Sequence, residues 1–574
     1  MKKELLLGNE AIARGAWEAG VRVASSYPGT PSTEITSALA KYQGVKCEWA
    51  PNEKVAVEVS FGAAMTGARA ISCMKHVGVN VSADPLYTAA YTGVNGGLVI
   101  VCADDPAMHS SQNEQDSRLI ARAAHIPMLE PADSQECKDF TKFAFEISEK
   151  YDTPVFLRTT TRLSHSRGVV ETDERVECPV KPYTKDVGKY VMMPGMARKR
   201  HVVVEQREAQ MSLDAADFAV NKIELRSKKL GVVCSGVVYE YVREALPDAS
   251  VLKLGLTYPL SEKLIRDFAG QVEELICVEE LEGVLEKDIK AMGIAVSGKE
   301  KTGVQGELSA AKIAGLFGGD VPEVQSQPAL PVRPPVLCPG CPHRATFYVL
   351  KKLGLTVFGD IGCYTLCALA PLAAMDATLC MGASVGMAFG AEKANGKDFS
   401  RHAVAVIGDS TFIHSGITSL INAVYNGSSI TVIIMDNRTT AMTGHQNNPA
   451  NGLNIYGEVA PELDLGALCE TIGAHVECCD PFDLKAFEAL VRQETARDCT
   501  SVIIAKRPCA LLKKQKITPC KVENCRNCGA CLKIGCPAIK RTENGIVIDE
   551  TLCVGCGLCA KVCPFHALDG GKAE

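Results

Sequence analysis

The sequence predicts a multidomain α/β protein that ends in a small α+β domain, and three observations predict it. The chain has 574 residues, and single hydrophobic cores stop growing well below that length. Apolar strand-like runs alternate with helical stretches in two separate parts of the chain. Eight of the 26 cysteines crowd into residues 525–563 at regular spacings. We therefore expect several cores of different architecture.

Composition excludes several classes of function. A net charge of −6, with 47% hydrophobic and 22% charged residues, is ordinary for a folded protein. The chain has no basic run of the kind that nucleic-acid binders carry, and neither an export signal nor a membrane-spanning stretch is evident. Most cysteines before residue 510 lie singly or in small groups, often in apolar runs such as "LVIVCA", which is typical of reduced thiols. We expect a cytoplasmic protein without nucleic-acid or membrane partners.

Residues 1–180 form the first predicted α/β domain. The helix-like stretch "NEAIARGAWEAG" is followed by the turn "YPGTPS" (27–32), by the helix-like "NEKVAVEVSFGAAMTGARA" (52–70) and by the strand-like "GLVIVCADDP" (97–106). Glu53 opens the second of these helices and is a candidate catalytic carboxylate. Glu58 is its rival, and a lone carboxylate on a helix is more often a solvated surface group.

A linker and a further α/β domain come next. Residues 181–228 are predicted to be a linker that contains a helix. Residues 229–325 alternate short β-rich runs with helical runs, as in "KLGVVCSGVVYEYVREAL". The Pro-rich stretch "QSQPALPVRPPV" (325–336) then predicts a crossing into a domain at residues 326–512.

Within residues 326–512, the stretch 404–437 predicts a strand, a helix and a second strand. The first strand runs into Gly408-Asp409-Ser410, and the second delivers Asn437. Because the carboxyl ends of parallel strands meet at one edge of a sheet, Asp409 and Asn437 should lie close together. A carboxylate, an amide oxygen and a diphosphate are ligands that suit Mg²⁺. The pattern predicts a magnesium-diphosphate site, the alternative being a surface turn that happens to contain Gly-Asp.

Three Gly-rich or Cys-rich loops in the same domain are expected to line that site: "CPGCPHR" (338–344), "GDIGCYTL" (359–366) and "MGASVG" (381–386). Glycine-rich turns that precede helices expose backbone N–H groups, which can hold a diphosphate. The predicted cofactor-lining residues are Cys338, Cys341, His343, Gly362, Cys363, Gly382 and Ser384. Cys338 and Cys341 with His343 could instead be half of a zinc site, but no second ligand pair stands nearby in the sequence.

The last predicted domain, residues 513–574, carries two cysteine runs. The second run has the bacterial ferredoxin spacing, and the first has one extra residue before its last cysteine. In that motif the remote fourth cysteine ligates the other cluster. One [4Fe–4S] cluster is therefore assigned to Cys525, Cys528, Cys531 and Cys563, and the other to Cys553, Cys556, Cys559 and Cys536. Zinc knuckles are the alternative, and Cys520 lies outside both sets as a bystander thiol.

Two motifs resemble those of known enzymes. The Gly-Asp…Asn arrangement is similar to the motif of thiamine-diphosphate enzymes, although Ser410 stands for the usual Gly. This resemblance implies Mg²⁺ ligation by Asp409, Asn437 and the carbonyl of Thr439. The turn "YPGTPS" resembles the Tyr-Pro-x-Thr-Pro-Ser turn of 2-oxoacid:ferredoxin oxidoreductases. It implies that Glu53 is the catalytic glutamate, which helps the aminopyrimidine deprotonate the thiazolium carbon, and that Thr30 contacts the substrate.

Nearly the whole chain resembles the indolepyruvate-oxidising branch of that family, most particularly in "MKHVGVNVSADP" (74–85) and "YTGVNGGLVIVCADDPAMHSSQNEQDSR" (91–118). Relatives that act on pyruvate or 2-oxoglutarate typically have Ser-Gly-Pro-Gly where this chain has Lys75-His76-Val77-Gly78. The resemblance thus implies that Lys75 and His76 bear on substrate class. Residues 229–320 resemble the carboxyl-terminal domain of transketolase.

The resemblance implies a catalytic subunit that converts an aryl 2-oxo acid and coenzyme A into an arylacetyl-CoA and CO₂ and reduces ferredoxin. Its cofactors would be thiamine diphosphate, Mg²⁺ and two [4Fe–4S] clusters. Its partner would be a smaller beta subunit, in a heterodimer or a dimer of heterodimers. Two alternatives stay open, a non-oxidative thiamine-dependent decarboxylase or carboligase and an electron-transfer scaffold without activity.

Overall fold

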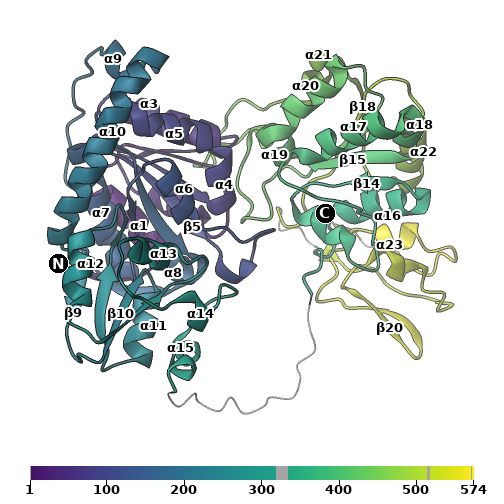
Figure 1. Ribbon diagram of the computed structural model, residues 1–574. Coiled ribbons are helices and arrows are strands. Elements are labelled where there is room, and N and C mark those ends of the chain that lie inside the picture. Colours follow the sequence, from purple (N-terminus) through teal and green to yellow (C-terminus); the bar gives the residue numbers. More distant parts are fainter. Residues whose placement is uncertain (1, 319–333, 513–516, 571, 574) are drawn as a thin grey trace. The chain divides into compact units, whose positions relative to one another are not determined.

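Figure 1 shows the computed structural model, which describes residues 2–318, 334–512, 517–570 and 572–573. The chain divides into two compact units, residues 1–328 and 329–574. Most of the Pro-rich crossing predicted over 325–336 lies outside the described residues. No helix among those described has the length and apolar character needed to cross a membrane.

A seven-stranded sheet is the centre of the first unit. Its strands follow the spatial order β12-β6-β7-β5-β4-β2-β3, and all neighbours are parallel except β12 and β6. The central runs "AISCMK" and "LVIVCAD" are buried at every position, as expected for parallel strands that helices cover on both faces. In sequence order the strands are β2 (Val23–Ser26), β3 (Lys46–Trp49), β4 (Ala70–Lys75), β5 (Leu98–Asp104), β6 (Met128–Leu129), β7 (Val155–Thr160) and β12 (Leu256–Tyr258).

Helices cover this sheet on both faces. Apolar residues of α3, α5 and α6 pack in one cluster against β4 and β5, while α7 packs on α1. An antiparallel ribbon of β1 (Lys2–Leu7) and β8 (Arg167–Thr172) adjoins them. The helices are α1 (Gly8–Glu18), α2 (Thr33–Leu39), α3 (Glu53–Met65), α4 (His76–Val81), α5 (Ala83–Thr92), α6 (Ser117–Ala123), α7 (Ser134–Tyr151) and α8 (Thr161–His165).

The predicted linker and the following domain share the first unit. The linker region contains α9 (Val187–Tyr190) and the 21-residue α10 (Pro194–Asp214), and its last strand joins the next sheet. That sheet has the order β13-β10-β11-β9, with β9 (Lys222–Glu224), β10 (Leu230–Ser235), β11 (Ser250–Leu254) and β13 (Glu274–Val278). The helices around it are α11 (Val238–Ala245), α12 (Glu262–Ala269), α13 (Val284–Ala291), α14 (Lys299–Thr302) and α15 (Ala310–Leu316).

A five-stranded parallel sheet is the core of the second unit. Its order is β14-β15-β16-β18-β17, with β14 (Thr356–Phe358), β15 (Ala403–Gly408), β16 (Thr431–Asp436), β17 (His475–Cys479) and β18 (Ser501–Lys506). Helices α16 and α22 cover one face, and α17, α20 and α21 cover the other. The helices are α16 (His343–Leu353), α17 (Ala383–Asn395), α18 (Lys397–Ser400), α19 (Asp409–Thr411), α20 (Ile417–Tyr425), α21 (Leu465–Ile472) and α22 (Leu484–Thr495).

The carboxyl-terminal part of the second unit is the small α+β domain that the cysteine runs predict. Two antiparallel ribbons pair β19 (Ile517–Thr518) with β22 (Lys572–Ala573) and β20 (Ile539–Thr542) with β21 (Gly545–Ile548). The 3₁₀ turn η6 (Ala530–Ile534) and helix α23 (Leu558–Lys561) follow the cysteine loops. A core of cysteine and aliphatic side chains joins this domain to the sheet domain through Ala345 and Phe482. Both parts of the second unit therefore form one packed body.

Candidate active site and electron-transfer groups

Burial separates the two candidate carboxylates of the first unit. Asn52 caps helix α3, and its side chain accepts a hydrogen bond from the backbone N–H of Val55 at 2.9 Å. Glu53 is the first residue of the helix and is only 4% exposed. A Cβ atom added at Gly78 would lie 2.6 Å from Oε1 of Glu53, so only glycine fits there. Glu58 instead forms an exposed ion pair with Lys54, which is a solvated surface role.

Lys75 and His76 lie where β4 ends and α4 begins. The Lys75 ammonium donates to the backbone carbonyl of Ser110, and burial lowers its pKa. His76 is fully buried, its Nε2 lies 3.2 Å from the carbonyl oxygen of Asn113, and burial lowers its pKa as well. A Cβ at Gly29 would stand 3.2 Å from Cβ of Lys75. The turn that contains Thr30 therefore lies beside Lys75.

The magnesium ligands predicted in the second unit come together. Strand β15 pairs in parallel with β16, and Asp409 and Asn437 directly follow the two strands. The Asp409 carboxylate accepts hydrogen bonds from the backbone N–H of Ser410 at 2.7 Å and of Arg438 at 3.0 Å. The side-chain oxygen of Asn437 accepts from the N–H of Thr439 at 3.2 Å. Oxygen atoms from both loops are thus gathered at one sheet edge.

The electrostatics of this edge suit a divalent cation. Asp409 is 2% exposed, and burial together with the neighbouring Asp436 raises the pKa of its carboxyl to about 8. Two buried carboxylates that repel each other are costly unless a cation or a proton compensates them. A carboxylate, an amide oxygen and backbone carbonyls are the donors that Mg²⁺ takes together with a diphosphate. The residues present therefore fit the predicted metal.

The predicted glycine-rich loops converge on the same edge because of Asp360, which the sequence analysis missed. Its buried carboxylate accepts hydrogen bonds from the N–H groups of Gly382 at 2.9 Å and Ser384 at 3.0 Å. Gly382 adopts a φ of +85°, and a Cβ there would approach Cβ of Ser415 to 2.5 Å. The hydroxyl of Ser384 is buried without a hydrogen-bond partner among the described residues. The Ser384 side chain lies beside the Asp360 carboxylate at the start of helix α17, the kind of position where a diphosphate can bind.

Two aromatic side chains tie the remaining loops to Asp409 and Asn437. The hydroxyl of Tyr364, which follows Gly362 and Cys363, accepts a hydrogen bond from the N–H of Gly408 at 3.0 Å. Nε2 of His343 lies 3.5 Å from the side-chain nitrogen of Asn437. Burial lowers the pKa of His343 to about 4, so its imidazole is neutral and can accept that hydrogen bond. Cys338 and Cys341 belong to the same loop as His343.

Four cysteines of the sheet domain gather at this loop, and only three of them belong to the loops that the sequence predicts to line the site. Burial raises the pKa of Cys363 to about 11, and the thiols of Cys509 and Cys338 add to the rise. Burial also raises the pKa of Cys341 to about 12, with Cys363 and Cys338 contributing. The backbone N–H of Cys509 donates to the carbonyl of Asn437 at 3.0 Å. Cys363 and Cys509 thus provide a second pair of thiols beside Cys338 and Cys341. No such pair stands near residues 338–341 in the sequence, so only the fold brings the four together.

The eight cysteines of the tail gather in two groups. Burial raises the pKa of Cys531, and the thiols that add to this are Cys525, Cys563 and Cys528. Burial likewise raises the pKa of Cys556, with contributions from Cys536, Cys520 and Cys553. This grouping follows the crossed pattern that the spacing predicts, although the ligand roles stay predictions. The second group also includes Cys520, which is therefore not the bystander that its place outside both cysteine runs predicts.

The loop at 338–344 connects the sheet domain to the second thiol group. Gly340 adopts a φ of +71°, and a Cβ there would lie 2.3 Å from Cγ2 of Val554 and 3.6 Å from Cβ of Cys556. The Arg344 guanidinium, 2% exposed, donates to the carbonyl of Ile534 at 3.0 Å and to that of Gly535. One loop thus contacts Asn437 on one side and the tail cysteines on the other.

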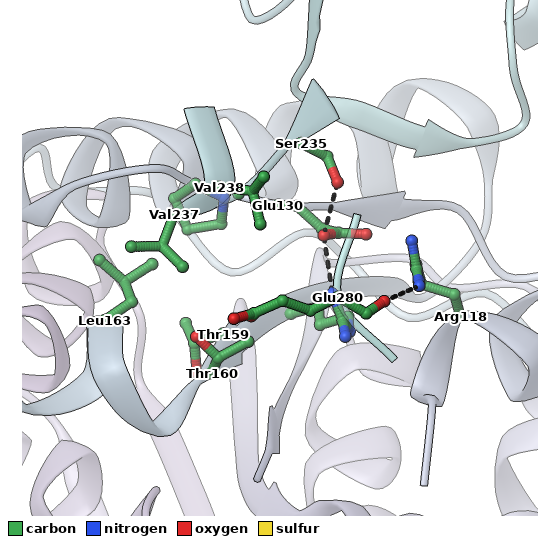
Figure 2. A pocket seen from close by; sticks show the side chains of 12 residues that line it. Arg118, Glu130, Thr159, Thr160, Leu163, Ser235, Val237, Val238 and Glu280 are labelled. Carbon is green, nitrogen blue, oxygen red and sulfur yellow. Dashed lines mark hydrogen bonds and ion pairs between the residues drawn. The ribbon is translucent and has the colours of Figure 1, made fainter. Parts of the chain in front are cut away.

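The first unit contains a polar pocket (Figure 2). It has about 320 Å³ of empty space, part of it open to solvent, between the two sheets of the unit. Glu130 accepts hydrogen bonds from Ser235 at 3.1 Å and Arg158 at 2.8 Å. Glu130 Oε1, Arg158 Nη2 and Thr160 Oγ1 are buried there without a hydrogen-bond partner among the described residues, and such atoms suit ordered water. The predicted residues Thr30, Glu53, Lys75 and His76 do not line it.

Three family models match the chain. They are described as "Pyruvate flavodoxin/ferredoxin oxidoreductase, thiamine diP-bdg" over residues 14–230, "Thiamine pyrophosphate enzyme, C-terminal TPP binding domain" over residues 360–505, and "4Fe-4S binding domain" over residues 546–569. The first match extends past the predicted boundary at residue 180 into the linker. The matches confirm two thiamine-diphosphate-binding domains and an iron–sulfur domain in one chain.

Several curated proteins are similar over nearly the full length. The chain is 41% identical to "Indolepyruvate oxidoreductase subunit IorA" of Archaeoglobus fulgidus, covering 100% of this chain and 98% of that protein. The subunit of the same name from Methanothermobacter marburgensis is 41% identical, covering 98% of this chain and 96% of that protein. That of Pyrococcus horikoshii is 39% identical over 99% and 97%. The similarity spans every domain described above.

Proposed function

The chain belongs to the family of indolepyruvate oxidoreductase subunit IorA, and from this premise we propose that it catalyses the oxidative decarboxylation of aryl 2-oxo acids. The substrate would be indolepyruvate or another arylpyruvate, coenzyme A would take the acyl group, and ferredoxin would receive the electrons. Because the relatives are named subunits, we propose that a smaller beta subunit completes the enzyme.

One observation carries the proposal. The loop at 338–344 contacts Asn437 through His343 and contacts the cavity of the tail cysteines through Gly340. A decarboxylase that transfers no electrons has no use for thiols packed against its metal edge. A scaffold without activity has no use for the buried pair of Asp409 and Asp436. An oxidoreductase needs both the acidic sheet edge, where the cofactor would bind, and the tail cysteines, which would carry the electrons away from it.

Thiamine diphosphate, when bound, supplies the electron sink for decarboxylation, and Mg²⁺ holds its diphosphate. We propose that Asp409, Asn437 and the carbonyl of Thr439 hold the metal, and that the turn at Gly382 and Ser384, which Asp360 holds in place, lies beside the diphosphate. The remaining proposed cofactor-lining residues are Gly362, Gly408, Ser410 and His343. Glu53 is the proposed proton-transfer group toward the aminopyrimidine.

Lys75, His76 and Thr30 are the proposed substrate-facing residues. The Lys75 ammonium has three N–H donors, and one of them goes to Ser110, so others can meet the carboxylate of a 2-oxo acid. Burial favours the neutral form of His76, which can donate or accept one hydrogen bond at Nδ1. That nitrogen is buried without a partner in the described part of the chain. Either a substrate oxygen or the side-chain hydroxyl of Thr30 would give Nδ1 of His76 a hydrogen-bond partner.

Iron–sulfur clusters supply one-electron carriers. The tail thiols are proposed to hold two of them, in the crossed arrangement given above. The four thiols of Cys338, Cys341, Cys363 and Cys509 are an all-cysteine set of the same size, and we propose that they hold a third. Iron analysis tests this count, because three clusters would give about 12 iron atoms per chain and two would give about 8. Replacing Cys509 by Ala should then remove about 4 of the 12.

The decisive experiment is anaerobic acceptor reduction by the two-subunit complex. Indolepyruvate, phenylpyruvate, pyruvate and 2-oxoglutarate are compared, each with and without coenzyme A. We expect the two arylpyruvates to reduce ferredoxin fastest, and only with coenzyme A present. Release of the aldehyde without reduction would support the non-oxidative alternative, and failure to bind thiamine diphosphate would support the scaffold.

A further inference from the structure

The cavity of the second thiol group has more cysteines than a cluster needs. It has about 380 Å³ of empty space, part of it open to solvent, and the cysteines that line it are Cys520, Cys536, Cys553, Cys556 and Cys559. All five are free thiols. A [4Fe–4S] cluster is held by four cysteine thiolates, and four of the five are the predicted ligands. Cys520 is the additional one.

Cys520 lies close to the three cysteines of the compact run. It follows strand β19 and is 3% exposed. Its backbone N–H points to Sγ of Cys553 at 3.4 Å, and its thiol interacts with those of Cys559 and Cys553. The side chain is therefore placed toward the cavity and not toward solvent.

The other tail group has no such surplus in the part of the chain that the structure describes. The thiols that surround Cys531 are Cys525, Cys528 and Cys563, which are its predicted co-ligands. The two groups thus differ by one thiol although their sequence motifs are nearly the same. This difference provides an internal control.

The two candidates for the fourth ligand are both remote from the compact run. Three thiolates from a Cys-x₂-Cys-x₂-Cys loop reach three irons, and the fourth iron takes a cysteine from elsewhere. Cys536 follows Gly535, which adopts a φ of +66°, and reaches the cavity from one side. Cys520 reaches it from the strand β19 side. Either thiolate can therefore complete the set.

We propose that Cys520 is a reserve ligand of the cluster bound by Cys553, Cys556 and Cys559. Cys536 completes the cluster in the ordinary state, and Cys520 replaces it when Cys536 is lost or chemically blocked. Where Cys536 is absent, the iron that it would bind is open, and the Cys520 thiolate would bond to that iron. Where Cys536 is blocked, its sulfur stays bonded to the blocking group and no longer to iron. In both cases the Cys520 thiol releases its proton to water, and no electron is transferred. The inference rests on the proposed assignment of clusters to the tail.

The experiment compares single and double variants of the full two-subunit complex, reconstituted with iron and sulfide without oxygen. The variants are Cys536→Ala, Cys520→Ala, Cys536→Ala with Cys520→Ala, Cys563→Ala, and Cys563→Ala with Cys520→Ala. The readouts are iron and sulfide per chain and the paramagnetic resonance spectrum of the reduced protein. Cys520→Ser, which is nearly isosteric, repeats the comparison without a change of packing.

We expect Cys536→Ala to keep the iron content of the wild type with an altered spectrum, and Cys520→Ala to keep both. The double variant at 536 and 520 should lose iron from this cluster. Cys563→Ala should lose iron from the other cluster to the same extent with or without Cys520.

Two results would overturn the inference alone. Either Cys536→Ala loses as much iron as the double variant, so that Cys520 does not substitute, or Cys520→Ala loses iron by itself, so that Cys520 is the resident ligand. A wild-type tail that takes up no iron would instead overturn the proposed function, and this inference with it. The wild-type measurement therefore distinguishes the two failures.

Discussion

Burying a carboxylate costs hydration free energy. A carboxylate that is buried all the same is therefore a candidate for a functional role, in which it binds a charge or transfers a proton. Glu53 is in that position, since it is 4% exposed and packed against Gly78. Glu58, one turn further along the same helix, is exposed and paired with Lys54. The two residues have the same chemistry and differ only in environment, which makes them a matched pair for mutation.

Glu53→Gln should preserve the shape of the site and remove a proton-transfer group. General acid–base catalysis contributes typically about 10²–10⁴-fold, so the turnover rate should fall by about that factor while thiamine diphosphate still binds. Glu58→Gln is the control and should change the rate by less than about threefold. Steady-state acceptor reduction and fluorescence titration of the cofactor measure the two effects. Equal losses in the two variants would contradict the assignment of Glu53.

Asp409 makes the affinity for the metal depend on pH. Burial and Asp436 raise its pKa to about 8 in the metal-free protein, so below that pH the carboxyl holds a proton. Mg²⁺ must displace this proton. The affinity should therefore rise up to about tenfold per pH unit from about pH 6 and level off above about pH 8. Calorimetric titration of Mg²⁺ and thiamine diphosphate into the cofactor-free protein measures this.

Asp436→Asn is the control for that titration. It removes the neighbouring charge, so the pKa of Asp409 should fall and the affinity should level off at a lower pH. A titration of the cofactor's own phosphates would be the same in both proteins. An unchanged pH profile in the variant would thus show that Asp409 is not the group responsible.

At the scale of secondary-structure elements, the start of helix α16 is the connection between the sheet domain and the tail. Its residue Arg344 is buried and donates to four backbone carbonyls, those of Leu337, Cys338, Ile534 and Gly535. Two of these carbonyls belong to the loop before the helix, and two belong to the turn η6 and its end. The guanidinium thereby holds the loop and the tail together.

Arg344→Met should detach the tail from the sheet domain. Hydrogen bonds from a charged group contribute about 1.5–3 kcal/mol each, and they are not additive, so we expect a loss of about 3 kcal/mol or more in the stability of the tail contact. Limited proteolysis after residue 512 should become faster, and cluster reduction should slow more than decarboxylation. The control is Lys352→Met, which changes a residue on the same helix as Arg344 and breaks its exposed ion pair with Glu488 of α22. Equal proteolysis of both variants would contradict this role.

At the scale of the whole molecule, a buried ion network joins the two sheets of the first unit. Arg118 of α6, 3% exposed, forms ion pairs with Asp116 at 2.6 Å and with Glu279 at 2.5 Å, just past the end of β13. Arg158 of β7 pairs with Asp104 at 2.7 Å and Glu130 at 2.8 Å. Arg118, Glu130 and Arg158 of this network line the polar pocket of Figure 2. The second sheet is therefore bound to the first by charge as well as by strand β12.

Arg118→Met should destabilise the first unit strongly, because it removes the cation nearest to the buried carboxylates of Asp116 and Glu279. Breaking a buried ion pair costs about 3–5 kcal/mol. Arg122→Met, which removes a partly exposed pair with Asp288, should cost about 1 kcal/mol or less. Denaturant unfolding followed by circular dichroism measures both. Similar midpoints for the two variants would refute the role of the network.

The sequence by itself determined the features that depend on local spacing. Compact cysteine runs, a strand that ends in Gly-Asp and the turn "YPGTPS" each place their residues within a few positions of one another, and so the family, the fold class and the iron–sulfur domain were all predictable. The pairing of Asp409 with Asn437 was also predictable, because adjacent parallel strands end at one sheet edge.

Only the tertiary structure decided which distant residues meet. Asp360 holds the turn at Gly382, Cys509 joins Cys338, and Cys520 enters the cavity of Cys553. No periodicity or motif relates these partners, since strand order and loop packing bring them together. Burial likewise separated Glu53 from Glu58, and burial is a property of the whole packed unit. Local pattern identifies the chemistry of a residue, and the surrounding fold determines its neighbours and its solvation.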